Sequence, residues 1–84
     1  MTRARRRPAP AHLASLALDP ASREPLYRQL YRAIREMILT GRLQPGARLP
    51  ASRTLARDLG LARNTVMAAF EQLHAEGYVG GRVG

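Results

Sequence analysis

Apolar residues recur at intervals of three or four in three segments of the chain, the spacing that places them on one face of an α-helix. The segments cover residues 25–40, 51–60 and 62–76. The stripe of the first segment consists of Leu26, Leu30, Ile34, Met37 and Ile38. Glycine stands at or next to the end of each segment, where helices commonly end. The pattern therefore predicts three helices.

The predicted second and third helices are short and are joined by a tight connection, Gly60-Leu61-Ala62. After the third helix, Tyr78-Val79 predicts a short strand, and Gly80-Gly81 predicts a bend. Two short helices joined through a glycine, with a longer helix before them and a strand after them, describe a winged helix-turn-helix. The predicted fold class is mainly α: a three-helix winged helix-turn-helix with a small β-wing that the chain leaves incomplete.

The two faces of the predicted third helix differ in character. Its inward stripe consists of Val66, Ala69, Phe70 and Leu73. At about 100° per residue, the residues opposite this stripe are Asn64, Ala68, Glu71 and Ala75. A helix with small and polar residues outward can enter the major groove of DNA, which is about 12 Å wide.

The positive net charge of the chain favours a polyanionic binding partner. The 84 residues carry a net charge of +8, and all 14 basic residues are arginine. Between Arg42 and Arg63 there are five arginines and one acidic residue, Asp58, so this short stretch holds half the net charge. Arginine forms forked hydrogen bonds with phosphate and with guanine.

The first 22 residues differ in composition from the rest, with four arginines among the first seven, followed by Pro8 and Pro10. The apolar run over 13–18 is too short for the core of a signal peptide or for a membrane span. We therefore expect a flexible basic arm over 1–22, a folded domain over 23–84 and no membrane segment. Two roles are possible for the arm: it contacts the DNA backbone, or it is an organelle transit peptide.

The chain offers little for catalysis. His12 lies in the arm and His74 on the flank of the third helix, without cysteine, paired carboxylates or a phosphate-binding loop to accompany them. The four glycines after residue 76 follow a helix instead of preceding one, which excludes a dinucleotide-binding fingerprint. We expect no enzyme activity, no metal site and no cofactor site in this chain. The lack of cysteine also favours a reduced, cytoplasmic compartment.

Several motifs resemble the DNA-binding domain of GntR-type transcription regulators. They are GRLQPGARLP at 41–50 and SRTLARDLG at 52–60. LARNTV at 61–66 and FEQLHAEGY at 70–78 are similar to the recognition helix and wing entry of that family. The resemblance covers residues 24–84 without a gap.

Two further stretches, PLYRQLY at 25–31 and LALD at 16–19, resemble the MocR branch of the family. The resemblance implies that a linker and a large domain similar to fold-type I aminotransferases follow the wing and bind pyridoxal phosphate. We therefore expect these residues to be the head of a longer protein, ending at Gly84 before the returning strand of the wing.

The resemblance also implies which residues contact DNA. Arg53 would hold the backbone or a base near the groove edge, and the opening of the recognition helix, Arg63-Asn64-Thr65, would make the main groove contacts. Arg82 and Gly84 match the wing tip. The expected DNA-contacting residues are Arg48, Arg53, Arg63, Asn64, Thr65, Arg82 and Gly84.

Two alanines depart from the family pattern. Ala51 and Ala62 stand where the family usually has serine at the start of a helix, and Ser52 is expected to take over as the cap of the second helix.

The function that the resemblance implies is sequence-specific binding of double-stranded DNA by the head of a bacterial transcription regulator, with residues 62–76 in the major groove. The parent protein is expected to be a homodimer, and the state of the isolated head stays open. The alternatives are a cationic amphipathic module that binds a membrane or a protein, and a nonspecific nucleic-acid binder.

Overall fold

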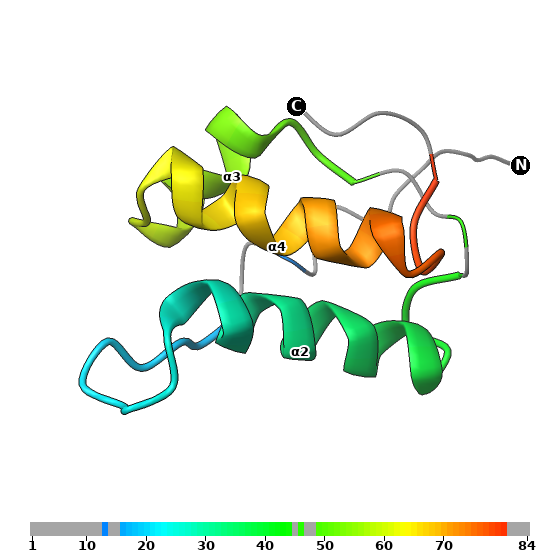
Figure 1. Cartoon of the computed structure of the whole chain (residues 1–84), viewed down its shortest axis with the longest axis horizontal. Coiled ribbons are helices and arrows are strands. Elements are labelled where there is room, and N and C mark those ends of the chain that lie inside the picture. The colour runs from blue at the N-terminus through cyan, green and yellow to red at the C-terminus, as the bar shows by residue number, and fades with distance from the viewer. Residues whose placement is uncertain (1–12, 14–15, 45, 47–48, 81–84) are drawn as a thin grey trace, which may run out of the picture.

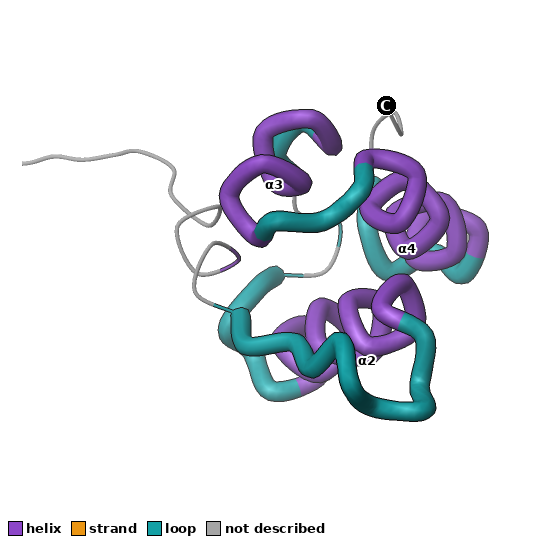
Figure 2. Tube along the Cα trace, turned by 90° about the vertical axis from the view of Figure 1, so that its left-hand side faces the viewer, coloured by secondary structure: helices purple, strands orange, loops and turns teal. Residues whose placement is uncertain are grey.

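The computed structural model describes residue 13, residues 16–44, residue 46 and residues 49–80, and within them it has three α-helices. Helix α2 spans Leu26–Leu39, α3 spans Ser52–Leu59 and α4 spans Arg63–Ala75. Helix α4 packs against both α2 and α3 (Figure 1). Viewed from the end, the three helices lie at the corners of a triangle (Figure 2). The predicted helices and the mainly α fold class are confirmed.

The core fills the space between the three helices. The residues that line it on α2 and α4 are the ones that the helical periodicity predicts to face inward, since burying an apolar stripe is what stabilises a short helix. The fully or nearly fully buried residues of these two stripes are Leu30, Ile34, Met37, Ile38, Val66, Ala69, Phe70 and Leu73. Helix α3 adds Leu55 and Ala56. Leu43 and Val79 close the end of the core where the loops meet.

The side chain of Gln29 fastens the segment before α2 to that helix. Its Oε1 accepts a hydrogen bond from the backbone N–H of Asp19 at 2.8 Å. Its Nε2 donates to the carbonyls of Asp19 at 2.9 Å and Glu24 at 2.8 Å. Gln29 is only 8% exposed, so these bonds satisfy a side chain that would otherwise be buried without partners.

The packed part of the chain begins before residue 23. Leu13 is 1% exposed and belongs to the core, and Leu16 and Leu18 pack against it. These leucines lie within residues 1–22, which were predicted to form a flexible arm. The backbone N–H of Leu16 donates to the carbonyl of Leu13 at 3.3 Å, and the hydrogen bonds between Gln29 and Asp19 fasten the following residues to α2.

The short strand predicted at Tyr78-Val79 is not formed, because both residues lie in a bend. Among the described residues, one backbone hydrogen bond joins this segment to the loop between α2 and α3, from the N–H of Gly46 to the carbonyl of Tyr78 at 3.1 Å. The loops approach so closely that a Cβ at Gly80 would lie 3.2 Å from the carbonyl oxygen of Gly46. One hydrogen bond is less than the repeating ladder that defines a strand pair. The described residues therefore include one hydrogen bond at the start of the wing and no strand.

A polar contact joins α2 to the end of α4. The hydroxyl of Tyr31 donates to the Glu76 carboxylate at 2.5 Å. The guanidinium of Arg35 lies 5.8 Å from the centre of the Tyr31 ring, within the range of a cation–π contact. The hydrogen bond raises the pKa of Tyr31 and lowers the pKa of Glu76, because it favours the ionised carboxylate and the protonated phenol.

We expect the Tyr31–Glu76 contact to make stability depend on acid pH. Because the pKa of Glu76 in the folded state is lowered from the ordinary 4.5, the contact stabilises the fold above that value and loses its effect as the pH falls through the lowered pKa. In urea unfolding, Glu76→Gln should be less stable than the wild type at pH 7, and the difference should shrink steadily below pH 4.5. Glu71→Gln, at an exposed position of α4, is the matched carboxylate-to-amide substitution away from the Tyr31 contact. A difference between wild type and Glu76→Gln that is as large at pH 3 as at pH 7 would contradict the assignment.

Candidate nucleic-acid interface

The turn between α3 and α4 sets the direction of α4. Gly60 has a φ of 71°, in the left-handed region that residues with a Cβ rarely adopt. The N–H of Leu61 donates to the carbonyl of Ala56 at 2.8 Å, and the N–H of Gly60 donates to the carbonyl of Arg57 at 3.3 Å. These bonds close α3 in the manner of a Schellman motif. The chain therefore changes direction within three residues, and α4 packs against α3.

One face of α4 is open to solvent. Asn64, Ala68, Glu71 and Ala75 are all exposed, whereas Val66, Ala69, Phe70 and Leu73 on the other face are buried. The described part of the chain leaves the small and polar face of α4 uncovered, as the periodicity predicts. A helix with this face outward is free to lie against another macromolecule.

The residues predicted to contact DNA fall into two groups. Arg63 and Asn64 are exposed and Thr65 is half-buried in the first turn of α4, and Arg53 is exposed at the second position of α3. The structure therefore gathers these four at the neighbouring N-terminal ends of the two helices. The other three, Arg48, Arg82 and Gly84, lie outside the described residues.

A residue that is not among the predicted DNA-contacting residues connects these two ends. Ser52, the first residue of α3, is 1% exposed, and its Oγ accepts a hydrogen bond from Nε of Arg63 at 3.2 Å. A signal for it exists in the sequence, since Ser52 precedes Leu55, Ala56 and Leu59 in the spacing of a buried stripe. A buried hydroxyl in such a stripe needs a partner.

The prediction that Ser52 caps α3 is wrong. The N-cap of α3 is Ala51, and Ser52 lies inside the first turn, with its hydroxyl directed to Arg63. Helix α4 likewise begins after an alanine, Ala62, whose φ of −67° and ψ of 143° are those of an ordinary N-cap. Both helices therefore start without an oxygen-bearing side chain at the cap position.

We expect Ala62→Ser to stabilise the domain. A serine at this N-cap can accept a hydrogen bond from a backbone N–H of the first turn, which raises the free energy of unfolding by about 0.5–2 kcal/mol. For a domain of this size each kcal/mol raises Tm by roughly 4–8 °C. Ala68→Ser makes the same substitution in the middle of α4, where serine is a weaker helix former than alanine, and should not raise Tm. Equal thermal shifts in the two variants would contradict a capping effect.

The electrostatics of this region suit an anionic partner. Arg53, Arg57 and Arg63 are exposed on α3 and α4. The ion pair found among the described residues is Glu24–Arg32, which joins the segment before α2 to α2, so within that part of the chain none of the three arginines is neutralised by a carboxylate at salt-bridge distance. Positive charge therefore remains available around the start of α4.

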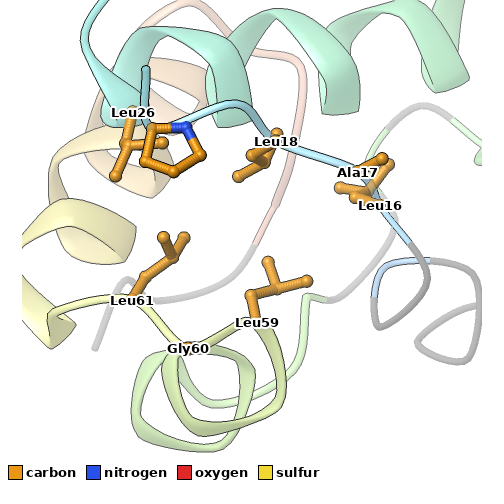
Figure 3. A pocket seen from close by; sticks show the side chains of 8 residues that line it. Leu16, Ala17, Leu18, Leu26, Leu59, Gly60 and Leu61 are labelled. Carbon is orange, nitrogen blue, oxygen red and sulfur yellow. The ribbon is translucent and has the colours of Figure 1, made fainter. Parts of the chain in front are cut away.

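A small apolar pocket of about 270 Å³ lies between the segment before α2 and the α3–α4 turn. Leu16, Leu18 and Leu26 face Leu59 and Leu61 across it (Figure 3). Ligand pockets combine apolar walls with a few placed polar groups. All the side chains that line this pocket are apolar, so it marks where the N-terminal segment packs and does not resemble a substrate site.

Other kinds of site are not indicated by the part of the structure that can be described. Residue 13 and residues 16–44, 46 and 49–80 contain no group of three or more histidine, cysteine or acidic side chains that could hold a metal ion. Within the same residues, no helix has the length and apolar character needed to cross a bilayer.

Comparison with known proteins agrees with the motifs. The family model "Bacterial regulatory proteins, gntR family" matches residues 26–84. The chain is 46% identical over 69 residues to the probable rhizopine catabolism regulatory protein MocR of Rhizobium meliloti, covering 82% of this chain and 14% of that protein. It is 41% identical over 64 residues to the pyridoxine biosynthesis transcriptional regulator PdxR of Corynebacterium glutamicum, covering 76% of this chain and 14% of that protein. The chain thus spans about one seventh of the length of these two relatives.

Among solved structures, the fold matches that of YtrA from Sulfolobus acidocaldarius, a GntR-family transcription factor. The TM-score is 0.71 and the sequence identity 35%, over 81% of this chain and 66% of that one. The family match over residues 26–84 includes α2, α3 and α4.

Proposed function

The chain belongs to the GntR family of bacterial regulatory proteins and is the DNA-binding domain of a transcription regulator, and from this premise we propose that it binds double-stranded DNA sequence-specifically, with α4 in the major groove. The helix-turn-helix of this family is a DNA-binding fold and not a catalytic one, in agreement with the expectation that the chain is not an enzyme.

The observation that carries the proposal is the open face of α4, together with the chemistry of its first turn. Arg63 and Asn64 project from that turn and are exposed. An arginine fork matches O6 and N7 of guanine, and an asparagine amide matches N6 and N7 of adenine. The half-buried Thr65 can reach a phosphate or a thymine methyl group. The outward residues beyond this turn are small enough at Ala68 and Ala75 to avoid obstructing a groove.

Contacts with the phosphate backbone complete the proposal. Arg53 is exposed at the start of α3, where a helix N-terminus adds backbone N–H groups that also favour an anion. We assign backbone contacts to Arg48 and minor-groove contacts at the wing to Arg82 and Gly84 on the strength of the family motifs, since these three lie outside the described residues.

For the whole protein we propose a cytoplasmic homodimeric regulator of the MocR branch, with a pyridoxal-phosphate-binding, aminotransferase-like domain after the wing. The similarity to regulators named MocR and PdxR supports this branch, and both are about seven times longer than the matched part. A single insertion reads few base pairs, and paired half-sites require two heads.

Selection from a random duplex library, followed by anisotropy titrations of the selected and a scrambled duplex at several salt concentrations, tests the proposal. We expect the selected duplex to bind at least tenfold more tightly at every salt concentration. Equal affinity for both duplexes, with a steep salt dependence, would overturn sequence reading and leave a nonspecific binder.

Circular dichroism with and without anionic vesicles tests the remaining alternative. A cooperative thermal melt without lipid is expected of a folded DNA-binding head. Helicity that is gained only on vesicles would instead indicate an amphipathic membrane-binding module.

A further inference from the structure

We propose that Ser52 is a positioning residue for DNA recognition: its hydroxyl holds Arg63 by Nε, so that the two terminal nitrogens of the guanidinium meet guanine end-on. This inference rests on the proposed function and deepens it, because it assigns a geometry to the arginine that opens α4. Nothing in the family motifs assigns such a role to Ser52.

The two partners differ sharply in their surroundings. Ser52 is 1% exposed, so its side chain is enclosed by the protein. Arg63 is exposed, yet its Nε lies 3.2 Å from that oxygen. Each residue is the first of its helix, so the backbone at both ends of the contact has helical geometry. One end of the Arg63 side chain is thus anchored in the protein, while the other end reaches solvent.

The anchor restricts which nitrogens can meet a base. A guanidinium has five N–H donors in a planar fork: one on Nε and two on each terminal nitrogen. The hydrogen bond to Ser52 uses the Nε donor. Guanine offers two acceptors, O6 and N7, which an arginine can meet either with both terminal nitrogens or with Nε and one of them. The second, side-on mode requires the bond to Ser52 to break, so the anchored side chain favours the end-on mode.

The anchor also orders the side chain before DNA arrives. A free arginine has many rotamers and loses most of them when it binds, which weakens the interaction. A side chain already held at Nε has lost part of that freedom on folding. The hydrogen bond should therefore strengthen specific binding without contributing a contact to DNA itself.

A double-mutant cycle on the full chain tests the role of Ser52. Titrations at low salt compare wild type, Ser52→Ala, Arg63→Ala and the double variant on the selected duplex and on a scrambled duplex. We expect Ser52→Ala to weaken binding to the selected duplex about 3- to 10-fold and to leave binding to the scrambled duplex unchanged, the loss that a misplaced contact produces. In the Arg63→Ala background, the same serine change should have no further effect.

Ser22→Ala is the matched control, because it removes a hydroxyl from an exposed serine before α2, and it should bind both duplexes like the wild type. A wild-type affinity of Ser52→Ala for the selected duplex would overturn the positioning role. So would an equal loss in the presence and absence of Arg63, since Ser52 would then act through the fold alone.

A measurement on the unmodified protein keeps the inference testable if Ser52→Ala fails to fold. In NMR spectra of the free protein, the Nε proton of Arg63 should exchange with water more slowly than that of Arg53, which is also exposed but has no such acceptor among the described residues. Equal exchange rates would overturn the anchor. Slow exchange at Arg63 in a protein without any sequence preference would instead leave the anchor intact and refute the proposed function.

Discussion

Replacing Arg63 by alanine should lower the affinity for the selected duplex by about 5- to 150-fold per half-site, the equivalent of the 1–3 kcal/mol by which one forked arginine–guanine pair discriminates. The side chain is exposed at the first position of α4, where the open face of the helix begins. Binding to unrelated DNA should fall much less, because one phosphate attraction at most is lost. Footprinting combined with anisotropy on single-base variants of the duplex measures both effects, and the preference at one base pair should relax.

Two control variants separate base reading from charge. Arg63→Lys keeps the positive charge but has no fork, so it should lose most of the base preference while retaining the salt dependence. Arg28→Ala removes the same charge from an exposed position of α2 and should leave base preference unchanged. If Arg63→Ala weakens binding to all duplexes by one common factor, the arginine binds phosphate and does not read a base.

Leu73→Ala is expected to lower the free energy of unfolding of the domain strongly. Leu73 is completely buried on the inner face of α4, and truncating a buried leucine to alanine costs about 2–5 kcal/mol because a cavity remains. A chain of this length has a total stability of about 4–13 kcal/mol, and a small core places it toward the low end. Thermal and urea unfolding by circular dichroism should show a Tm lower by 10 °C or more, and a Tm close to the wild type would mean that the core is not where α4 packs on α2.

Leu39→Ala makes the same substitution where little apolar surface is lost. Leu39 is 61% exposed at the end of α2, so its free energy of unfolding should change by no more than about 0.5 kcal/mol. The contrast between two identical substitutions isolates burial as the cause. A large loss in both variants would indicate that α2 ends differently from the structure described above.

Local sequence patterns were sufficient to predict the three helices. The predicted ranges 25–40 and 62–76 correspond to Leu26–Leu39 and Arg63–Ala75, because long amphipathic stripes and terminal glycines define helix ends well. The open face of α4 follows from the same periodicity, since residues opposite a buried stripe stay outside. The site residues on that face could therefore be placed, although their contacts with DNA stay predictions.

Contacts between positions distant in the sequence could not be predicted in this way. Gln29 meets Asp19 ten residues away, and Ser52 meets Arg63 eleven residues away, through side-chain hydrogen bonds that depend on how the helices pack. The strand predicted at Tyr78-Val79 depends on pairing of the same long-range kind: among the described residues one backbone hydrogen bond, from Gly46 to Tyr78, joins the two loops, and a strand pair needs a repeating ladder.

The packing of the N-terminal segment determines where this DNA-binding domain can be joined to another protein. Leu16 and Leu18 face Leu59 and Leu61 across the apolar pocket, and these two leucines flank Gly60 in the turn between α3 and α4. A chimaera that joins this head to another protein at residue 23 would expose those leucines to water and leave Gln29 without its bonds to Asp19. A fusion junction placed before Leu13 would keep the packing of the N-terminal segment next to the α3–α4 turn. The orientation of α4, the helix proposed to face DNA, would then be preserved.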